Sequence, residues 1–266
     1  MSDSGVPSYR VLELAPRSRR YCVAIFVINE GGRLLAQLDR MGPRADEVDI
    51  LVADGGSTDG STLRENLEPR RVRALLTKTG PGRLSAQMRM AFDYGLREGY
   101  EGIVTMDGND KDDPSAVSDF VQALGEGFDY VQGSRFIAGG RALNTPIHRL
   151  LAIRLVHAPL IRRASGFPYT DTTNGFRGYS RRLLADPRVA PFRDVFSSYE
   201  LHYYLAIRAA RLGFRVKETP VTRAYPRGGP TPTKIHGLRG YRIVLRDLFR
   251  ACRHRFDPPE PKAPLA

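Results

Sequence analysis

Residues 48–61 have the sequence VDILVADGGSTDGS, in which an apolar run, Val48–Ala53, leads directly into a turn rich in glycine and aspartate. A short apolar run bounded by turn residues is typical of a strand that is buried on both faces. In parallel sheets, ligands bind beyond the carboxyl ends of the strands. Asp54 and Asp59 therefore stand where carboxylates accept hydrogen bonds from a base or a ribose, although Gly and Asp are also ordinary residues of a strand-to-helix turn.

Apolar strands and amphipathic helices alternate on both sides of this stretch. Strands are predicted at Tyr21–Ile28, Val48–Ala53, Val72–Leu76, Gly102–Met106 and Phe128–Gln132. Helices are predicted at Gly32–Met41, Ser61–Leu67 with Ser61 as N-cap, Ser85–Leu96 and Pro114–Leu124. This alternation predicts an α/β fold, a single domain whose central sheet is mostly parallel and is covered by helices on both faces.

The second half of the chain is richer in arginine. Its predicted elements are a helix at Ile147–Arg163, a strand at Thr173–Tyr179, a helix at Tyr199–Leu212 closed by Gly213, a strand at Phe214–Val221 and a long basic amphipathic helix at His236–Phe256. The first 20 residues are predicted to be a flexible lead, and residues 257–266, with four prolines, a loose tail.

A second acidic turn, MDGNDKDDP at Met106–Pro114, follows the strand that ends near Thr105. Its four carboxylates lie within seven residues and repel one another unless a cation or a hydrogen-bond network lies between them. Oxygen ligands of this kind suit Mg²⁺ or Mn²⁺, which bridge carboxylates and substrate phosphates. The alternative is a solvated loop with an aspartate cap before Pro114.

A glycine-rich turn, GPGRLS at Gly80–Ser85, opens the next predicted helix. It lacks the third glycine of a dinucleotide fingerprint, so as a motif it is weak. Arg83, at the start of the helix, is still positioned to meet a phosphate or a nucleobase.

Composition excludes several classes of protein. Hydrophobic residues make up 41% of the chain and charged residues 26%, which excludes a wholly disordered chain. No apolar run approaches the roughly 18 residues of a transmembrane helix, and the first ten residues lack a signal-peptide core. We therefore expect cytoplasmic synthesis without export. Cys22 and Cys252 form no CxxC pair, which argues against a disulfide scaffold or a cysteine-rich zinc site.

The chain is strongly basic, with 41 Lys and Arg against 29 Asp and Glu and a net charge of +12. This excess suits a nucleic acid, an anionic lipid surface or a phosphorylated substrate, and equally a solvated arginine-rich surface. No helix-turn-helix, zinc-finger or RNP aromatic signature is present, so we expect no nucleic-acid partner.

The order of the motifs resembles that of glycosyltransferase family two enzymes with the GT-A (Rossmann-like) fold. The motifs are Asn29-Glu30, VADGGSTDGS, GPGRLSAQ, MDGNDKDDP, QGSRF and DTTNGFRGYS. Within the family, the chain looks most like the dolichol-phosphate mannosyltransferases and polyprenyl-phosphate glycosyltransferases. The resemblance implies a domain at residues 21–235, with a nucleotide-sugar half at 21–134 and an acceptor half at 135–235, followed by the basic helix at 236–256.

The resemblance also implies roles for individual residues. Those implied to bind the donor are Asn29, Glu30, Asp54, Gly82, Arg83, Asp107, Gly108 and Asn109. Those implied to hold Mg²⁺ or Mn²⁺ are Asp107, Asn109 and Asp110. Those implied to bind the acceptor or its phosphate are Arg135, Arg149, Arg177, Arg223, Arg227 and Lys234. The catalytic set is Asp107, Asp171, Glu200 and Arg135.

The chain departs from the family pattern in three places. The family's DxD motif is DxN here, because position 109 is Asn, and Asp110 is the alternative ligand. The proline that usually precedes the Asn-Glu pair is missing, and so are the C-terminal transmembrane helices of some polyprenyl-phosphate members.

The function implied is inverting, metal-dependent transfer of a hexose from a nucleotide-sugar, such as GDP-mannose or UDP-glucose, to polyprenyl or dolichyl phosphate in cell-envelope biogenesis. The alternative acceptor is a saccharide hydroxyl, which would need Asp171 or Glu200 as general base, whereas a phosphate is already anionic. A donor-binding scaffold without catalysis is disfavoured by the acidic loop and Arg135. The two basic helical segments, 147–163 and 236–256, predict peripheral binding to an anionic membrane surface at its inner face. They are also compatible with a membrane partner subunit.

Overall fold

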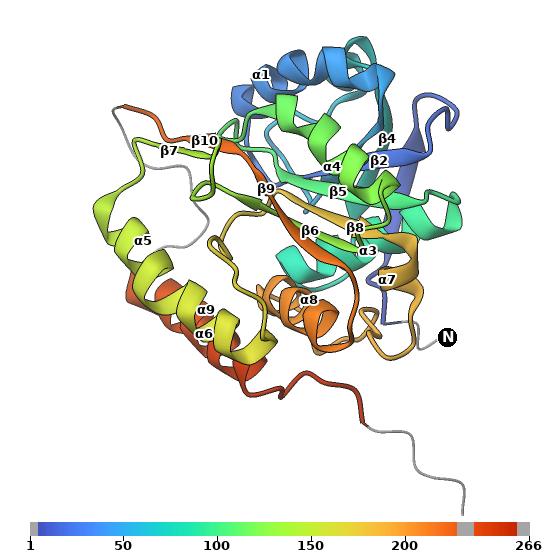
Figure 1. Cartoon of the computed structure of the whole chain (residues 1–266). Helices are drawn as coiled ribbons and strands as arrows, with labels where there is room; N and C mark the ends of the chain where they lie inside the picture. The colour runs from blue at the N-terminus through green and yellow to red at the C-terminus, as the bar shows by residue number, and fades with distance from the viewer. Residues whose placement is uncertain (1–4, 228–236, 260–266) are drawn as a thin grey trace, which may run out of the picture.

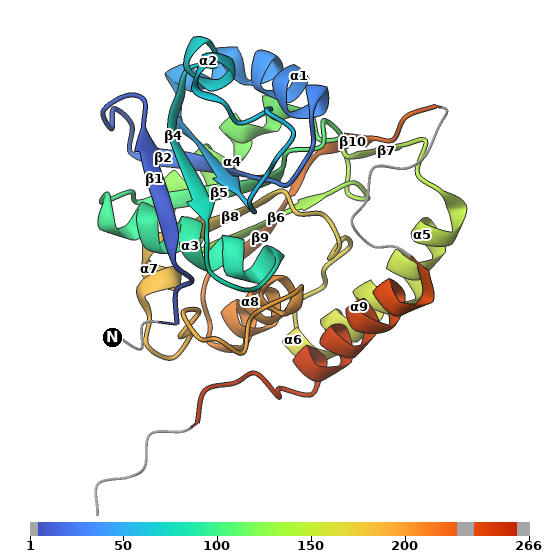
Figure 2. The same ribbon diagram turned by 180° about the vertical axis from the view of Figure 1, so that it is seen from behind.

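The central sheet has eight strands. In the computed structural model, which describes residues 5–227 and 237–259, helices lie on both faces of this sheet (Figures 1 and 2). In order across the sheet, the strands are β1 (Tyr9–Glu13), β4 (Val72–Lys78), β3 (Asp49–Asp54), β2 (Tyr21–Val27), β5 (Gly102–Asp107), β8 (Arg177–Ser180), β6 (Tyr130–Ser134) and β9 (Val216–Pro220). Only β1 and β8 run antiparallel to their neighbours in this sheet of the described chain. The predicted α/β fold with a mostly parallel sheet is confirmed.

Two apolar clusters fill the space between this sheet and the helices. On one face, α1 (Gly32–Met41) and α4 (Val117–Gly125) bury side chains such as Leu34 and Phe120. On the other face, α3 (Leu84–Arg97) and α8 (Glu200–Arg211) do the same. The remaining helices are α2 (Arg64–Leu67), α5 (Ile147–Ala152), α6 (Ala158–Ser165), α7 (Arg181–Ala185) and α9 (Gly237–Cys252), with 3-10 turns at Gly42–Asp46, Glu68–Arg70 and Pro114–Ala116.

The predicted flexible lead contains an ordered edge strand. β1 pairs antiparallel with β4, from Tyr9 opposite Lys78 to Glu13 opposite Ala74, and it lies at the edge of the sheet (Figure 2). The Tyr9 hydroxyl donates to Asp93 over 2.9 Å, which ties the strand to α3. The prediction of flexibility is therefore wrong for this segment, because backbone pairing orders a strand whose side chains are only half buried.

Two elements are shorter than predicted. The helix expected from Ser61 begins only at Arg64, and Ser61 is not its cap, because the Ser61 hydroxyl donates to Asp59 instead (2.7 Å). The strand expected from Thr173 begins at Arg177, since Asp171 Oδ1 accepts from the Thr173 nitrogen (3.2 Å) and Asn174 Oδ1 from the Phe176 nitrogen (3.1 Å) in the preceding loop. In both places a local side-chain hydrogen bond holds the backbone in a turn.

Residues 147–165 in the arginine-rich second half form one long helical arm. The predicted helix at 147–163 is observed as α5, a π-helical turn at Ile153–His157 and α6 in unbroken succession. α9 packs against α6 and α8, and both views show α9 running alongside this arm (Figures 1 and 2). A second, two-stranded sheet joins β7 (Arg141–Leu143) to β10 (Thr222–Ala224) beside it. Among the described residues, no helix combines the length and the apolar character needed to cross a bilayer.

Candidate active site

A cavity of about 710 Å³ opens where β2, β3 and β5 end. Val27 from β2, Gly55 after β3 and Asp107 from β5 all line it. The cavity therefore lies at the carboxyl edge of the parallel strands, the position at which sheets of this kind bind ligands. α8, α9 and the arm from α5 to α6 provide its opposite wall.

The turn after β3 is held by its own aspartates. Asp54 Oδ1 accepts hydrogen bonds from the backbone nitrogens of Gly56 (3.1 Å) and Ser57 (2.8 Å) and from the Ser57 hydroxyl (2.6 Å). Asn29 Oδ1 accepts from the Thr58 nitrogen (2.7 Å), which ties the end of β2 to the same turn. These two predicted donor ligands therefore shape the turn, whereas the adjacent Glu30 lines the cavity itself.

The glycine-rich turn also borders the cavity. Gly82 and Arg83 both line it. Gly82 has a φ of +99°, and a Cβ atom there would lie 2.6 Å from the Cβ of Ala86, so the turn requires glycine. Gly108 is required for packing instead, since a Cβ there would lie 2.3 Å from Val27. The structure thus places Arg83 at the cavity and packs Gly108 closely against β2.

Asp107, at the end of β5, faces a cluster of buried charges. Its Oδ2 accepts from Arg223 Nη2 over 2.8 Å, and Arg223 also binds the fully buried carboxylate of Asp112. Burial alone would raise the pKa of Asp107, but Arg223 and Lys111 outweigh it and hold that pKa at about 2. Burial, with the nearby Arg223, lowers the pKa of Lys111 to about 7. Asp107, Arg223 and a lysine whose pKa lies near neutrality therefore meet on the cavity floor, and Arg223 is also paired with the buried Asp112.

Asp107 and Asn109 are the oxygen ligands that this site offers to a divalent cation. The Oδ1 atom of Asn109 is buried without a hydrogen-bond partner, while its amide nitrogen lies 3.4 Å from Asp107 Oδ2. A buried acceptor beside a carboxylate fits Mg²⁺ or Mn²⁺. Asp110, the alternative ligand, instead binds Arg40 at 2.6 Å. Within residues 5–227 and 237–259, no group of three His, Cys, Asp or Glu side chains could hold a metal ion.

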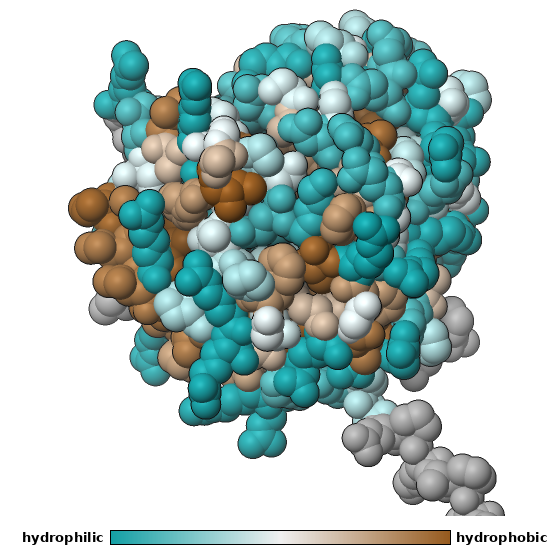
Figure 3. All heavy atoms as spheres, viewed as in Figure 1, coloured by the Kyte–Doolittle hydropathy of each residue, from teal (hydrophilic) through white to brown (hydrophobic). Residues whose placement is uncertain are grey.

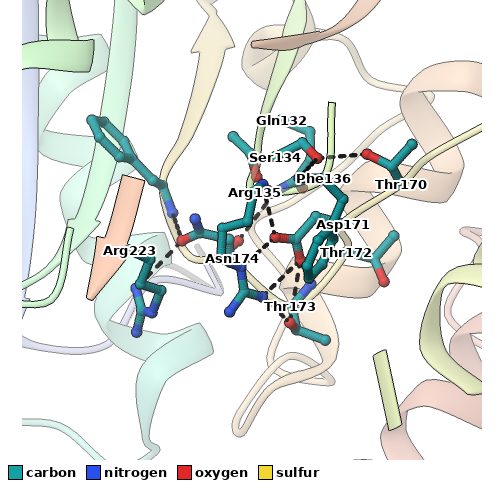
Figure 4. Close-up of polar contacts among 12 residues, drawn as sticks. Gln132, Ser134, Arg135, Phe136, Thr170, Asp171, Thr172, Thr173, Asn174 and Arg223 are labelled. Atoms are coloured by element: carbon teal, nitrogen blue, oxygen red, sulfur yellow. Dashed lines mark hydrogen bonds and ion pairs between the residues drawn. The ribbon is translucent and has the colours of Figure 1, made fainter. Parts of the chain in front are cut away.

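Arg135 and Asp171 form a buried ion pair at the side of the cavity (Figure 4). Arg135 donates from Nε to Asp171 Oδ2 (2.6 Å) and from Nη2 to Asp171 Oδ1 (3.0 Å), and also to the Thr173 hydroxyl (2.9 Å). Burial opposes the charge of Asp171, but Arg135 and two backbone nitrogens outweigh it and lower its pKa. Both carboxylate oxygens of Asp171 are therefore engaged by Arg135. This arrangement suits a residue that positions the Arg135 side chain better than one that abstracts a proton.

Glu200 begins α8 and closes the turn before it. Its Oε2 accepts from the backbone nitrogens of Ser197 (3.1 Å) and Ser198 (2.5 Å). Burial raises the pKa of Glu200. Its carboxylate does not line the cavity among the described residues, so the geometry assigns it to the turn.

The predicted acceptor arginines differ in what they contact. Arg177 is fully buried and donates to the carbonyl oxygens of Thr172 (2.9 Å), Asn174 (2.9 Å) and His202 (2.5 Å), so its role is largely structural. Arg149 lines the cavity above the Tyr225 ring. Arg227 is exposed, and Lys234 lies outside the described residues.

Two histidines that the sequence analysis did not identify also line the cavity. His157 and His202 are both buried, and the Nδ1 atom of each has no hydrogen-bond partner. Burial lowers the pKa of His157 to about 4 and that of His202 well below its usual value, so both rings are neutral near pH 7. In the sequence they look like core residues of apolar helices, and only the tertiary packing turns them toward the cavity.

The cavity is cationic within and apolar at its exit. The described side chains that line it include seven cations and two carboxylates: Lys78, Arg83, Lys111, Arg135, Arg149, Arg177 and Arg223, with Glu30 and Asp107. The apolar end of the cavity, called its exit below, reaches the surface at the exposed Tyr241 and Leu245. The apolar residues that line this end come from the arm and α9: Ala152, Ile153, Val156, Tyr241, Val244 and Leu245. A set of exposed apolar residues, the apolar rim, continues outward from it: Ile147, Leu151, Leu155, Tyr241, Leu245 and Phe249. Figure 3 shows apolar side chains gathered over α5 at the left of the view.

Known proteins share this sequence pattern and fold. The family model described as "Glycosyl transferase family 2" matches residues 22–187. The polyprenol monophosphomannose synthase of Mycolicibacterium smegmatis is 32% identical over 209 residues, 77% of this chain and 77% of that protein. The undecaprenyl-phosphate mannosyltransferase of Micrococcus luteus is 32% identical over 209 residues, 76% of this chain and 83% of that protein. Glucosyl-3-phosphoglycerate synthase from Mycobacterium tuberculosis, crystallised with Mn²⁺, UDP-glucose and glycerol 3-phosphate, has a TM-score of 0.59 at 20% identity, covering 90% of this chain and 81% of that chain.

Proposed function

Because this chain belongs to glycosyl transferase family 2, we propose that it moves a hexose from a nucleotide-sugar, such as GDP-mannose or UDP-glucose, to polyprenyl or dolichyl phosphate at the cytoplasmic membrane face. Membership of the family confirms the resemblance drawn from the motif order. The relatives at 32% identity are named for transfer to a polyprenol or undecaprenyl phosphate. The observation that carries the proposal is the single cavity that joins a cationic wall to an apolar exit.

The cationic wall suits a donor whose leaving group gains negative charge. When the bond between the anomeric carbon and the donor phosphate oxygen breaks, its electron pair stays on the nucleoside diphosphate. Preorganised cations that surround that oxygen stabilise the transition state more than the ground state. Arg83, Lys111 and Arg223 line the cavity from three separate segments and supply such charge.

The charge of the acceptor decides whether the reaction needs a general base. An acceptor phosphate is already an anionic nucleophile, so its oxygen attacks the anomeric carbon without a general base. Asp171 and Glu200, the two candidate bases, are both engaged in structural hydrogen bonds. This favours a phosphate acceptor over a saccharide hydroxyl, which would need a base within reach.

The apolar exit suits the acceptor's hydrocarbon chain. Ile153 and Val156 on the arm face Val244 and Leu245 on α9 across the exit, and the apolar rim continues beyond them. Exposed arginines flank the rim on both helices: Arg154, Arg163, Arg242, Arg246 and Arg250. An apolar stripe bordered by arginines is typical of a helix that lies in an anionic membrane interface. We therefore propose that the protein docks there from the cytoplasmic side.

We propose that the catalytic site also accepts Mg²⁺ or Mn²⁺, which Asp107 and Asn109 would hold. A bound divalent cation supplies positive charge beside the leaving diphosphate. The support is the unpartnered Asn109 oxygen next to the Asp107 carboxylate. With only these two ligands from the described part of the chain, the donor's own phosphate oxygens would have to complete the coordination.

The decisive experiment measures release of nucleoside diphosphate from a panel of nucleotide-sugars, with and without a short polyprenyl phosphate in detergent. We expect release from one donor to depend on the lipid phosphate. The matching polyprenol, which lacks the phosphate, is the control and should give no release above background. Donor binding without any response to the lipid phosphate, together with transfer to a saccharide, would contradict the lipid acceptor.

A further inference from the structure

Lys111 is a cavity residue for which neither the motifs nor the relatives provide a role. It follows Asn109 by two positions on the loop after β5, and its side chain is almost fully buried. Its ammonium group lies 5.1 Å from the centre of the Tyr225 ring, a cation–π distance that keeps it on the cavity floor. A lysine buried in the wall of the cavity, two residues from Asn109 of the proposed cation site, calls for a functional explanation.

The charges around Lys111 are already balanced by the protein. Arg223 binds Asp107 (2.8 Å) and Asp112, and Lys111 interacts electrostatically with both carboxylates. Asp107 is therefore opposed by the Arg223 guanidinium, and by Lys111 in its protonated form, before any ion arrives. A diphosphate bound in the cavity would favour that protonated form. A divalent cation that bound beside Asp107 would have to compete with both side chains, and of the two nearby oxygen ligands one is an uncharged amide.

We propose that Lys111, together with Arg223, acts as a built-in cation that stabilises the leaving diphosphate, so that sugar transfer continues when divalent cations are removed. This inference rests on the function proposed above and specifies which group supplies the charge. In the step, an acceptor phosphate oxygen forms a bond to the anomeric carbon while the bond from that carbon to the donor phosphate breaks. The electron pair remains on the diphosphate, whose added negative charge the two side chains face.

Three variants separate this role from a merely structural one. Lys111→Gln removes the charge and places an amide oxygen beside Asp107 and Asn109. Lys111→Arg keeps the charge. Lys217→Gln, at a lysine that pairs with Glu126 outside the cavity, is the matched control. Thermal melting of each variant shows whether it has folded.

Transfer rates are measured in excess EDTA and across a Mn²⁺ titration. We expect the wild type, Lys111→Arg and Lys217→Gln to keep transfer activity in EDTA. We expect Lys111→Gln to lose that metal-free activity by about 10²–10³-fold, the effect of removing one preorganised charge-stabilising group, and to recover much of it with Mn²⁺. Wild-type transfer that falls to background in EDTA would overturn the inference.

A second measurement does not depend on activity. Electron paramagnetic resonance of free Mn²⁺ reports its binding to the protein without donor or acceptor. We expect Lys111→Gln to bind Mn²⁺ about tenfold more tightly than the wild type, because a competing cation is gone. Equal Mn²⁺ affinity in the two proteins would overturn the inference. If no variant transfers sugar to the lipid under any condition, the proposed function fails, and this binding comparison still decides the role of Lys111.

Discussion

At the scale of single residues, Asp107 holds the two cations of the cavity floor in place. It accepts from Arg223 at 2.8 Å and stabilises Lys111 electrostatically. We predict that Asp107→Asn lowers the rate of sugar transfer by at least about 100-fold, because the cations lose the carboxylate that orients them toward the diphosphate. Initial rates of nucleoside diphosphate release in the presence of polyprenyl phosphate measure this effect.

Asp113→Asn in the same loop is the matched control. Asp113 accepts from the backbone nitrogen of Ser115 (3.0 Å) and caps the following 3-10 turn, and it does not line the cavity in the described structure. We expect its rate to stay close to that of the wild type. An equal loss of activity in both variants would mean that the loop's fold, and not the Asp107 charge, is what the substitutions disturb.

The Arg135–Asp171 pair gives a prediction about stability. Asp171→Asn leaves a buried Arg135 without its counter-charge, so we expect the free energy of unfolding to fall by about 3–5 kcal/mol. Urea denaturation measures it, and Glu101→Gln, which breaks an exposed pair with Arg20, should cause little measurable change. If Asp171→Asn abolished turnover with stability unchanged, Asp171 would be a base after all.

His157 gives a prediction about pH. Its pKa falls from 6.5 to about 4 in the folded protein because the ring is buried, so the unfolded chain takes up a proton first as the pH falls. The free energy of unfolding should therefore be greatest above pH 6.5 and lose up to roughly 3 kcal/mol by pH 4 from this group. Urea denaturation at pH 7 and pH 4 should show a smaller loss for His157→Gln. His148→Gln, at an exposed position on α5, is expected to behave as the wild type does.

Sequence reasoning recovered the charged residues of the site better than the neutral ones. Asp107 and Arg135 belong to motifs whose order along the chain is distinctive, whereas Arg223 was only implied by the resemblance to bind phosphate. The structure brings all three to the cavity. His157 and His202 carry no such signal, because a lone histidine among apolar residues looks like core. The ion-pair partners of Asp171 and Asp110 could not be predicted from the sequence either, because only the tertiary fold brings Arg135 and Arg40 next to them.

At the scale of elements, hydrophobic periodicity identified the central strands but not the edge strand β1. β2, β3 and β5 are apolar runs buried on both faces, so their pattern survives in the sequence. β1 is a five-residue strand with half-exposed side chains, and only its pairing with β4 orders it. The extra π turn in the arm likewise has no sequence signature of its own, because it depends on how the arm packs.

The arm and α9 give a prediction about membrane binding. Leu155 on the arm is 69% exposed and Leu245 on α9 is 38% exposed, so neither substitution removes core packing. We predict that Leu155→Asp and Leu245→Asp each lower the affinity for anionic lipid vesicles by about tenfold, since an apolar side chain no longer enters the interface. Sedimentation with vesicles measures the affinity.

Leu63→Asp is the control for this pair. Leu63 is 52% exposed and precedes α2, away from the apolar rim. We expect its vesicle binding to match the wild type. Equal weakening by all three substitutions would show that general solubility, and not the apolar rim, controls association with lipid.

At the scale of the whole molecule, the net charge of +12 matters less than where the charges lie. The apolar exit of the cavity, the apolar rim and the flanking arginines all belong to the side formed by the arm and α9. Under the proposed function, a protein oriented by these features would meet the lipid phosphate at the exit, while the strand ends, where the nucleotide-sugar would bind, stay in water. We then expect the orientation of the protein on the membrane to depend on the arginines beside the apolar rim, because salt screens charges that lie more than about one Debye length away.

Two double variants with the same net charge test this dependence on location. Arg242→Gln with Arg250→Gln removes two exposed charges beside the rim, while Arg64→Gln with Arg188→Gln removes two exposed charges elsewhere. We predict that the first pair weakens binding to anionic vesicles by about 1 kcal/mol per arginine, and that the second pair has little effect. Raising the salt concentration should reduce the difference between the two variants, because ions screen the rim charges. Equal weakening by both variants would mean that the overall field of the molecule, and not the rim, draws it to the membrane.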